Sequence, residues 1–369
     1  MKIAHIDEVM PHVAGRTDFV VAKRDGYVVI DYLFQDLDTF AEPIRRECRG
    51  IKFDAVTGKT LARPFHKFFN IGERAETQPE SIDFTRPHWI MSKVDGSMIH
   101  PMIVNGALVL STRMGRTQHA MTAERHLTPV LVSWFKKCLT AGWTPICEWI
   151  APDNRIIIKY PDSKLVLLAI RDTVSGDYLG PDAVDDGARR AGIEAVNLHP
   201  TWDGDARAFM ASVAALKDEE GYVIRFADGL WLKCKAVDYV QKSSAKSAIT
   251  LEKNALAAIL SGAIDDVKPL LTDEDLRAIE NYERSVLAGI SETAKIVTAL
   301  VAAGANADQK TFAVTHMAGV EPQMRGMAFA VRKGADARAT VCATILKSTG
   351  SQTDVDAARP LFGGTTWTL

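Results

Sequence analysis

The pattern of hydrophobic and polar positions in the first two thirds of the chain predicts short β-strands with helices inserted between them. The expected strands are rich in β-branched and aromatic residues and lie at 27–34, 50–54, 89–93, 98–104, 107–113, 144–151, 155–160, 164–172, 221–226 and 230–235. Turn dipeptides such as Asp95-Gly96, Asn105-Gly106 and Asp228-Gly229 separate several of them, as hairpins require. Helices are expected at 119–141, 181–192 and 203–216.

After about residue 240 the strand pattern ends and helical spacing of apolar residues takes over. Thr272 followed by Asp275 is a helix start signal. One apolar face then continues until Gly304, which offers a stop. Further helices are expected through 308–347.

Length and composition fit an ordinary globular protein of two or three domains. The chain has 369 residues, of which 47% are hydrophobic and 24% charged, which excludes wholesale disorder and a disulfide-stapled miniprotein. We expect an α+β domain at 1–240 and an all-helical domain at 241–369. The formal net charge is −2, so a polyanionic partner must be met by a local cluster of cations.

The five cysteines form no C-x-x-C pair, which favours a reducing cytosol. The first residues lack the features of a secretion signal, and no stretch is expected to reach the ~20 apolar residues that span a bilayer. We therefore expect a cytoplasmic protein with no membrane partner. Phosphate-loop, dinucleotide-binding and zinc motifs are absent from the sequence.

The sharpest chemical feature is the segment Lys93-Val94-Asp95-Gly96-Ser97, in which a lysine ends an apolar strand and precedes a tight turn. That arrangement would hold an amine rigidly at a sheet edge. The pattern K-x-D-G is short, so a hairpin with an exposed lysine is the alternative interpretation.

Other charged residues recur at strand ends in a fixed order. Glu148 lies inside an apolar strand, where an unpaired carboxylate is costly, and Glu220 opens a later strand. Lys233 and Lys235 are two residues apart and therefore share one face of a strand. Two further cations at strand ends are Arg49 and Lys67. Together these residues suit a nucleoside triphosphate and its metal.

The residue types match covalent nucleotidyl transfer. A lysine that attacks the α-phosphorus of a nucleotide must first lose its proton, and nearby cations and a divalent metal lower its pKa. The same cations neutralise the phosphate and the departing pyrophosphate. A hard metal needs oxygen ligands, which Glu220 could supply.

The ordered series of motifs resembles the ATP-dependent RNA ligases of the bacteriophage RNA ligase 1 family, within the covalent nucleotidyltransferase superfamily. The motifs are ECRGI (47–51), KFFN (67–70), KVDGS (93–97), EWIAPDNRI (148–156), LLAIRD (167–172), EGYV (220–223) and KCK (233–235). The resemblance covers residues 30–240 and continues weakly into the helical tail.

The resemblance implies an α+β nucleotidyltransferase domain with ATP-grasp-like antiparallel sheets, followed by an all-α C-terminal domain related to the RNA substrate. It implies ATP and Mg²⁺ as cofactors, Lys93 as the nucleophile that becomes AMP-lysine, and Glu148 and Glu220 as essential carboxylates. The residues implied to contact ATP are Tyr32, Arg49, Lys67, Lys93, Arg113, Glu148, Lys233 and Lys235. Asp95, Gly96 and Tyr239 are further essential candidates, and Glu220 and Asp265 are implied to hold the metal.

Plainer interpretations of some residues remain open. Tyr32 alternates with apolar neighbours and could serve packing, and Asp265 could lie in a solvated helix turn. Arg49 could form a surface salt bridge. Phe68 and Phe69 could form a base-stacking wall or part of the core. Arg113 stands where the family usually has a lysine.

The expected activity is the joining of RNA 5′-phosphate and 3′-hydroxyl ends through AMP-lysine and a 5′-adenylylated RNA. We expect a monomer that repairs broken RNA, such as a tRNA nicked in its anticodon loop, in the cytoplasm of a phage-infected bacterium. The alternatives are a catalytically idle RNA-end-binding protein and a DNA ligase or capping enzyme. The last two normally carry an OB-fold after the lysine pair, which the helical tail argues against.

Overall fold

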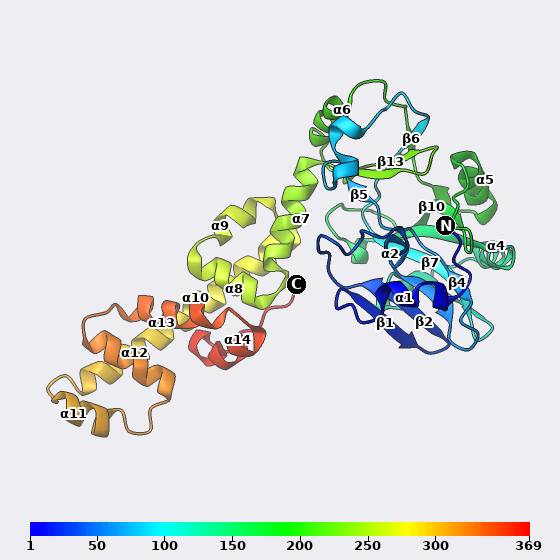
Figure 1. Ribbon diagram of the computed structural model, residues 1–369. Coiled ribbons are helices and arrows are strands. Elements are labelled where there is room, and N and C mark those ends of the chain that lie inside the picture. Colours follow the sequence, from blue (N-terminus) through cyan, green and yellow to red (C-terminus); the bar gives the residue numbers. More distant parts are fainter. The chain divides into compact units, whose positions relative to one another are not determined.

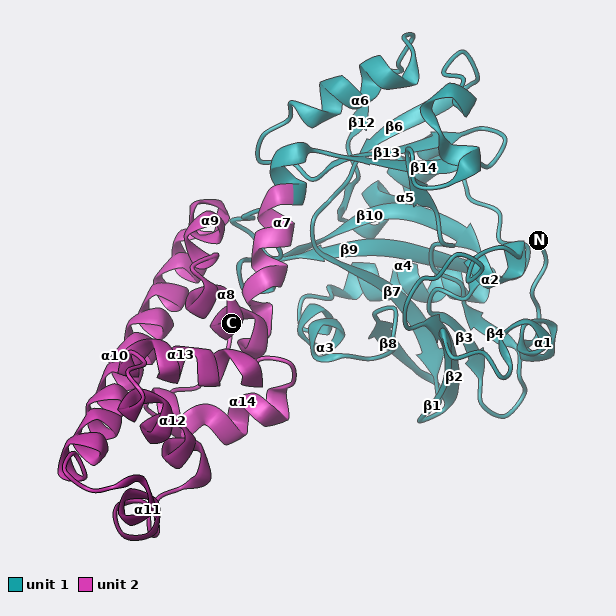
Figure 2. Ribbon diagram, turned by 60° about the vertical axis from the view of Figure 1, so that its left-hand side comes forward, with its two compact units in different colours: residues 1–240 teal, residues 241–369 magenta.

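The computed structural model describes residues 1–369, which divide into two compact units, Met1–Val240 and Gln241–Leu369. The first unit mixes strands and helices, and the second is built from helices (Figures 1 and 2). Helix α7, Val237–Thr250, begins in the first unit and ends in the second. The predicted order of an α+β part followed by a helical part is confirmed.

Three sheets form the first unit. The first has the order β1-β2-β3-β4, with β1 Phe19–Arg24, β2 Tyr27–Tyr32, β3 Ile51–Asp54 and β4 Thr60–Ala62. The second has the order β11-β10-β9-β7-β8, with β7 Ser97–Val104, β8 Ala107–Ser111, β9 Trp143–Ile150, β10 Lys164–Asp172 and β11 Glu194–Ala195. The third has the order β12-β6-β13-β14-β5, with β5 Phe69–Asn70, β6 His88–Ser92, β12 Leu198–His199, β13 Gly221–Phe226 and β14 Trp231–Lys235.

The helices that accompany these sheets are α1 Met10–Val13, α2 Pro43–Glu47, α3 Gln118–Glu124, α4 Pro129–Thr140, α5 Pro181–Ala191 and α6 Ala206–Ala214. Helices α4 and α5 pack on one face of the second sheet. The other face of that sheet packs against the third sheet, whose opposite face is covered by α6. The candidate site lies where the second and third sheets face each other.

Strand β9 shows how alternation places side chains at this junction. Cys147 and Trp149 point into the core beneath α4 and α5, whereas Ile146 and Ile150 point toward the third sheet. Glu148 has the same parity as the two isoleucines, so the two-residue period directs its carboxyl group to the junction.

Most predicted strands are present, and three sequence expectations are corrected. The expected helix 119–141 is two helices, because Thr128 caps α4 and Pro129 occupies its first position. The expected strand 155–160 is not a strand. The Asp95-Gly96 turn is no hairpin, because β6 and β7 belong to different sheets. By contrast, Asn105 and Gly106 form the β7–β8 hairpin turn, both with positive φ.

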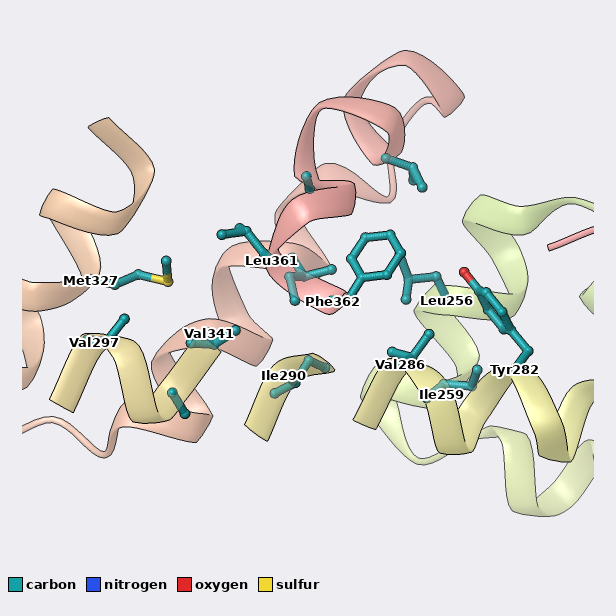
Figure 3. Packing of buried hydrophobic residues seen from close by; sticks show 14 of the residues in the cluster. Leu256, Ile259, Tyr282, Val286, Ile290, Val297, Met327, Val341, Leu361 and Phe362 are labelled. Carbon is teal, nitrogen blue, oxygen red and sulfur yellow. The ribbon is translucent and has the colours of Figure 1, made fainter. Parts of the chain in front are cut away.

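The second unit has its own hydrophobic core. Its helices after α7 are α8 Glu252–Ser261, α9 Ile264–Val267, α10 Asp273–Ala303, α11 Gln309–Thr311, α12 Pro322–Arg332, α13 Ala337–Ser348 and α14 Gln352–Ala358. Thr272 caps α10 by accepting from the Asp275 N–H, as the sequence signal predicts. Figure 3 shows Val286, Ile290 and Val297 of α10 facing residues of the other helices.

Helix α10 is long enough, and apolar enough over an 18-residue window with mean hydropathy 1.6, to cross a membrane by length and composition. The expectation that no stretch reaches this length is therefore wrong. The buried positions of α10 lie in the core of the second unit, which accounts for the apolar character of that face.

Candidate functional site

A cavity of about 290 Å³ lies between the second and third sheets. Its polar lining comprises Arg49, Ser92, Lys93, Glu148, Lys233 and Lys235. Its apolar lining includes Phe65, Phe68, Met91, Leu168, Val223 and Trp231. One cavity thus combines an apolar part with four cations and a carboxyl group, a combination that suits a nucleotide.

Lys93 follows β6 directly and its backbone is fixed, because its N–H donates to the Gly221 carbonyl at 2.8 Å. Its Nζ atom lies 2.7 Å from Glu220 Oε1. Lys235 Nζ approaches the same oxygen at 2.9 Å. Glu220 is buried, so one carboxylate positions two ammonium groups at the edge of the cavity.

Gly221 allows Glu220 to sit where it does. Its φ is +127°, and a β-carbon at this position would collide with the Cys234 carbonyl oxygen on the neighbouring strand. This collision explains why glycine follows Glu220 in the sequence. Only glycine lets β13 begin this close to β14.

Glu148 is buried, and burial raises the pKa of its carboxyl group to about 8, with Lys93 opposing and Glu220 and Asp95 adding to the rise. The protonated form is therefore favoured in the absence of an added cation. A divalent cation would reverse this preference, because carboxylate oxygens are the ligands that hard cations prefer. Glu148 and Glu220 thus fit a Mg²⁺-type ion by the chemistry of their donors.

For Lys233, burial shifts the pKa in the opposite direction, because the charged form of this side chain is a cation. Burial, together with the charges of Lys67, Arg49 and Lys93, lowers the pKa of its ammonium group to about 7. Its Nζ also lies 5.4 Å from the centre of the Phe68 ring. An anionic ligand in the cavity would favour the charged form.

Asp95 connects the segment after Lys93 to two other parts of the first unit. Its Oδ2 accepts the backbone N–H groups of Ile157 and Ile158, at 2.8 and 2.7 Å, and its Oδ1 accepts the Tyr239 hydroxyl at 2.7 Å. The Asp95 N–H donates to the Tyr160 hydroxyl. The two isoleucine N–H groups bind a carboxylate rather than a strand, which explains why 155–160 is not β-structure.

Gly96 is packed against β9. A β-carbon on this residue would collide with the Trp149 carbonyl oxygen and come within 3.1 Å of the Glu148 Cγ atom. Asp95 and Gly96 therefore hold the nucleophile candidate in place by different means, one by hydrogen bonds and one by the absence of a side chain.

Three predicted ATP contacts, Tyr32, Lys67 and Arg113, lie beside one another but do not line the cavity. Lys67 Nζ is 5.4 Å and the Arg113 guanidinium 4.5 Å from the centre of the Tyr32 ring. Burial lowers the pKa of Lys67. Of the three, Lys67 acts on the cavity, since its charge contributes to the low pKa of Lys233.

A buried network of titratable side chains supports Arg113 and was not anticipated from the sequence. Lys52 is completely buried, and its Nζ donates to the carbonyls of Thr112 and Arg113 at 2.7 and 3.0 Å. It also contacts His100 Nε2 at 2.8 Å, and the buried Asp31 pairs with Arg113 Nε at 2.8 Å. Burial sets the pKa of Lys52 well below its usual range.

Trp231 is a second residue missed by the sequence interpretation. It lies two and four residues before the lysine pair, so it shares their face of β14 and lines the cavity with them. The two-residue spacing that predicts a shared face for Lys233 and Lys235 also places Trp231 on that face. Of the two phenylalanines left open, Phe68 lines the cavity and Phe69 belongs to a hydrophobic core.

Asp265 and Glu220, the two residues predicted to hold the metal, belong to different units of the chain. Asp265 lies in the second unit, its side chain is 77% exposed, and it pairs with Lys268 at 3.1 Å. This environment matches the alternative of a solvated helix turn. No group of three or more His, Cys, Asp or Glu side chains in the chain is arranged to hold a metal ion.

Two family models match consecutive parts of the chain. The family model described as RNA ligase matches residues 47–246, and that of the T4 RNA ligase 1 C-terminal domain matches residues 246–339. An Archaeal ATP-dependent RNA ligase structure is similar with a TM-score of 0.50 and 14% identity, over 77% of this chain and 78% of that one. This likeness supports the fold, a mixed α+β part with sheets followed by a helical C-terminal region.

Two relatives are similar in sequence. The protein named "Putative RNA ligase" from Thermovibrio ammonificans is 34% identical over 181 residues, 48% of this chain and 47% of its own. "RNA ligase 1" of Bacteriophage TS2126 is 29% identical over 223 residues, 58% of this chain and 56% of its own. The chain thus spans about half the length of the curated relatives it matches. Because the RNA ligase model covers more than half of its residues, the protein belongs to the RNA ligase family and has a C-terminal part of the T4 RNA ligase 1 type.

Proposed function

We propose that the protein is an ATP-dependent RNA ligase that uses Lys93 as its nucleophile. The observation that carries the proposal is the position of Lys93 Nζ, 2.7 Å from Glu220 at the edge of a cavity that also holds Lys233, Lys235 and an apolar wall. Membership of the RNA ligase family supports the choice of RNA as the substrate.

In the first step the Lys93 amine attacks the α-phosphorus of ATP. A phosphorus–nitrogen bond forms, the bond to the β-phosphate breaks, and pyrophosphate leaves. Glu220 is within hydrogen-bond distance to take the proton that the lysine loses. Arg49, Lys233 and Lys235 line the cavity and offset the charge of the phosphates.

In the second step an oxygen of the RNA 5′-phosphate attacks the AMP phosphorus, the phosphorus–nitrogen bond breaks, and Lys93 regains its proton. In the third step the RNA 3′-hydroxyl loses its proton and attacks the adenylylated 5′-phosphate. A phosphodiester bond forms, the bond that joins this phosphate to AMP breaks, and AMP leaves with the bonding electron pair and can take up the proton. A bound divalent ion would supply charge neutralisation at the phosphates. Glu148 and Glu220 are the residues proposed to hold it.

We propose Mg²⁺ as this ion, a broken tRNA as the natural substrate, and the cytoplasm of a phage-infected bacterium as the place of action. All five cysteines are free, which suits a reducing compartment. We further propose that the protein acts as a monomer, with the helical unit contributing to the choice of RNA. Asp265 stays a proposed metal-associated residue of that unit.

The test is incubation of the full chain with α-labelled ATP and Mg²⁺, followed by a denaturing gel. We expect a covalent label that Lys93→Ala abolishes, that EDTA prevents, and that Lys59→Ala, a change at an exposed lysine, leaves intact. Absence of label would leave an RNA-end-binding protein without turnover. A label from GTP in preference to ATP would favour a capping enzyme, and sealing of DNA in preference to RNA would favour a DNA ligase.

A further inference from the structure

The segment 33–41, which follows β2, exposes three large apolar side chains to solvent. Leu33 is 58% exposed, Phe34 49% and Leu37 88%. Single exposed apolar residues are ordinary, but several in one short segment indicate an interaction surface. We call these three residues the apolar loop surface.

The exposure does not come from loose attachment of the segment. The Asp36 N–H donates to the Thr39 hydroxyl at 2.9 Å, and that hydroxyl donates to the buried Asp18 at 2.6 Å. The Leu37 carbonyl accepts from Arg74 Nη1 at 3.0 Å. The backbone is thus held by neighbouring elements while its apolar side chains point outward, as in a surface organised before binding.

The apolar loop surface borders the cations of the candidate site. Leu33 directly follows Tyr32, whose ring lies under Arg113 and near Lys67. On the other side, Gln35 donates to Glu73 at 3.2 Å.

Glu73 in turn connects the segment to the cavity. Its Oε2 accepts from the backbone and side chain of Asn70, which pairs with the cavity residue Lys233 between β5 and β14. The charge of Lys233 also contributes to the lowered pKa of Glu73. The segment therefore lies beside the proposed phosphate-binding cations.

We propose that Leu33, Phe34 and Leu37 bind an unpaired nucleobase of the RNA that the protein joins. The proposal rests on the proposed RNA ligase function and adds a specific contact to it. Cations beside exposed apolar side chains match a single-stranded nucleic acid, which offers phosphates and flat base faces together. A duplex hides its base faces by stacking, so the surface would select an unpaired nucleotide.

The first measurement is the Kd of the full chain for a fluorescein-labelled, 5′-phosphorylated single-stranded RNA, by fluorescence anisotropy. Phe34→Ala is expected to raise the Kd at least about 5-fold, because stacking of one base on an aromatic ring has an effect of this size. Leu37→Ala removes an apolar contact and is expected to raise the Kd in the same direction. Phe34→Tyr keeps a ring and should restore binding to within about 2-fold. Val56→Ala removes an apolar side chain that is 93% exposed elsewhere in the first unit and should leave the Kd unchanged.

The second measurement separates base stacking from a general loss of affinity. The same RNA is prepared with one abasic nucleotide at each of the three positions nearest either end. At one position, removing the base should weaken binding to wild type but should not weaken binding to Phe34→Ala further, which is the signature of two groups in contact. Full additivity at every position would overturn the proposal.

Labelling of Lys93 from ATP is measured in parallel and should be unchanged in Phe34→Ala. Loss of labelling in the wild type would reject the proposed function, whereas the anisotropy measurements would still test the base contact. An unchanged Kd with a lowered melting temperature would instead assign the apolar loop surface to contacts within the chain and overturn the proposal.

Discussion

Glu148 and Lys233 show that burial acts on a carboxyl group and on an ammonium group in opposite directions within one cavity. The carboxyl group holds its proton up to about pH 8, and the ammonium group loses its proton near pH 7. Both shifts reduce the charge that is buried in the cavity. Both also oppose the charged forms that would bind a metal cation and a triphosphate, so ligand binding must supply the missing stabilisation.

The first prediction concerns the stability of the protein with Glu148 replaced by glutamine. In the unfolded chain this carboxyl group ionises near pH 4.5, but in the folded chain only near pH 8. The unfolded state therefore binds fewer protons between these values, and the free energy of unfolding falls as the pH rises through this range. Glu148→Gln should remove this fall in the free energy of unfolding, which amounts to roughly 5 kcal/mol at most.

Urea unfolding of both proteins at pH 5, 6, 7 and 8 measures this difference. The gap between Glu148→Gln and wild type should widen in favour of the variant as the pH increases. Glu148→Asp, which keeps a carboxyl group, is the control and should retain much of the pH dependence. Parallel stability curves for wild type and Glu148→Gln would contradict the assigned shift.

The second prediction concerns proton uptake at Lys233. At pH 8 its neutral form predominates in the free protein, because burial lowers its pKa to about 7. A bound triphosphate favours the ammonium form, so binding should take up about one proton. Calorimetry with α,β-methylene-ATP in two buffers of different ionisation enthalpy measures this number.

Lys233→Met should abolish most of the uptake. Lys137→Met, which changes an exposed lysine of α4, should leave it intact. If the heats of binding are equal in both buffers for the wild type, Lys233 is already charged in the free protein and the interpretation is wrong.

At the scale of elements, the third prediction concerns the contact between the segment after Lys93 and β9. Gly96→Ala should lower the free energy of unfolding by about 1–3 kcal/mol, because the new methyl group collides with the Trp149 carbonyl oxygen. It should also slow Lys93 labelling, because moving β9 displaces Glu148. Urea unfolding and the rate of label incorporation are the measurements.

Gly106→Ala is the matched control in the β7–β8 turn. Its φ is +77° and a β-carbon there meets open space, so only backbone strain of about 1 kcal/mol is expected. Its labelling rate should equal that of the wild type. Equal labelling rates for Gly96→Ala and Gly106→Ala would show that the β9 contact does not position the reacting groups.

The elements themselves were largely predictable from the sequence, because each strand carries its own alternation and each turn its own glycine. β10 and β13 were predicted with the observed ends, 164–172 and 221–226. The division of the strands among three sheets was not predictable, because pairing is decided between segments far apart in the chain. For this reason the Asp95-Gly96 dipeptide predicts a hairpin although it connects two sheets.

Site residues whose chemistry requires a fixed spacing along a strand were predictable. Properties that depend on burial in the folded chain were not. Lys233 and Lys235 were expected on one face of a strand, and both line the cavity. Nothing in the local sequence around Lys52 indicates complete burial, because its partners are carbonyls about sixty residues away. The raised pKa of Glu148 likewise depends on packing between two sheets.

At the scale of the whole molecule, each unit has its own core. One cluster of buried residues runs from Ile249 to Trp367, and the other clusters lie within the first unit. Folding of each unit is therefore expected to depend mainly on its own packing. This expectation gives the fourth prediction.

Calorimetric unfolding should resolve two transitions. Val286→Ala should lower only the midpoint temperature of the second unit's transition, because the lost methyl groups lie in the core of that unit. The free energy of unfolding of that unit should fall by about 2–3 kcal/mol. Val29→Ala, at a fully buried position of the first unit, should lower only the other transition. α,β-methylene-ATP with Mg²⁺ should raise only the transition that Val29→Ala lowers.

A single transition that both substitutions lower together would show that the two units unfold as one. Stabilisation by nucleotide of the transition that Val286→Ala lowers would show that the nucleotide binds outside the cavity described above.

The position of Lys93 at the edge of the cavity, where we propose that it accepts AMP, has a consequence for ion-exchange chromatography of the protein. The proposed transfer of AMP to Lys93 would remove one ammonium charge and add one phosphate charge, so the formal net charge of −2 would become about −4. Free and adenylylated molecules would then elute separately from an anion exchanger. Protein isolated from cells would carry a record of its last encounter with ATP, and pyrophosphate would convert the later-eluting fraction into the earlier one.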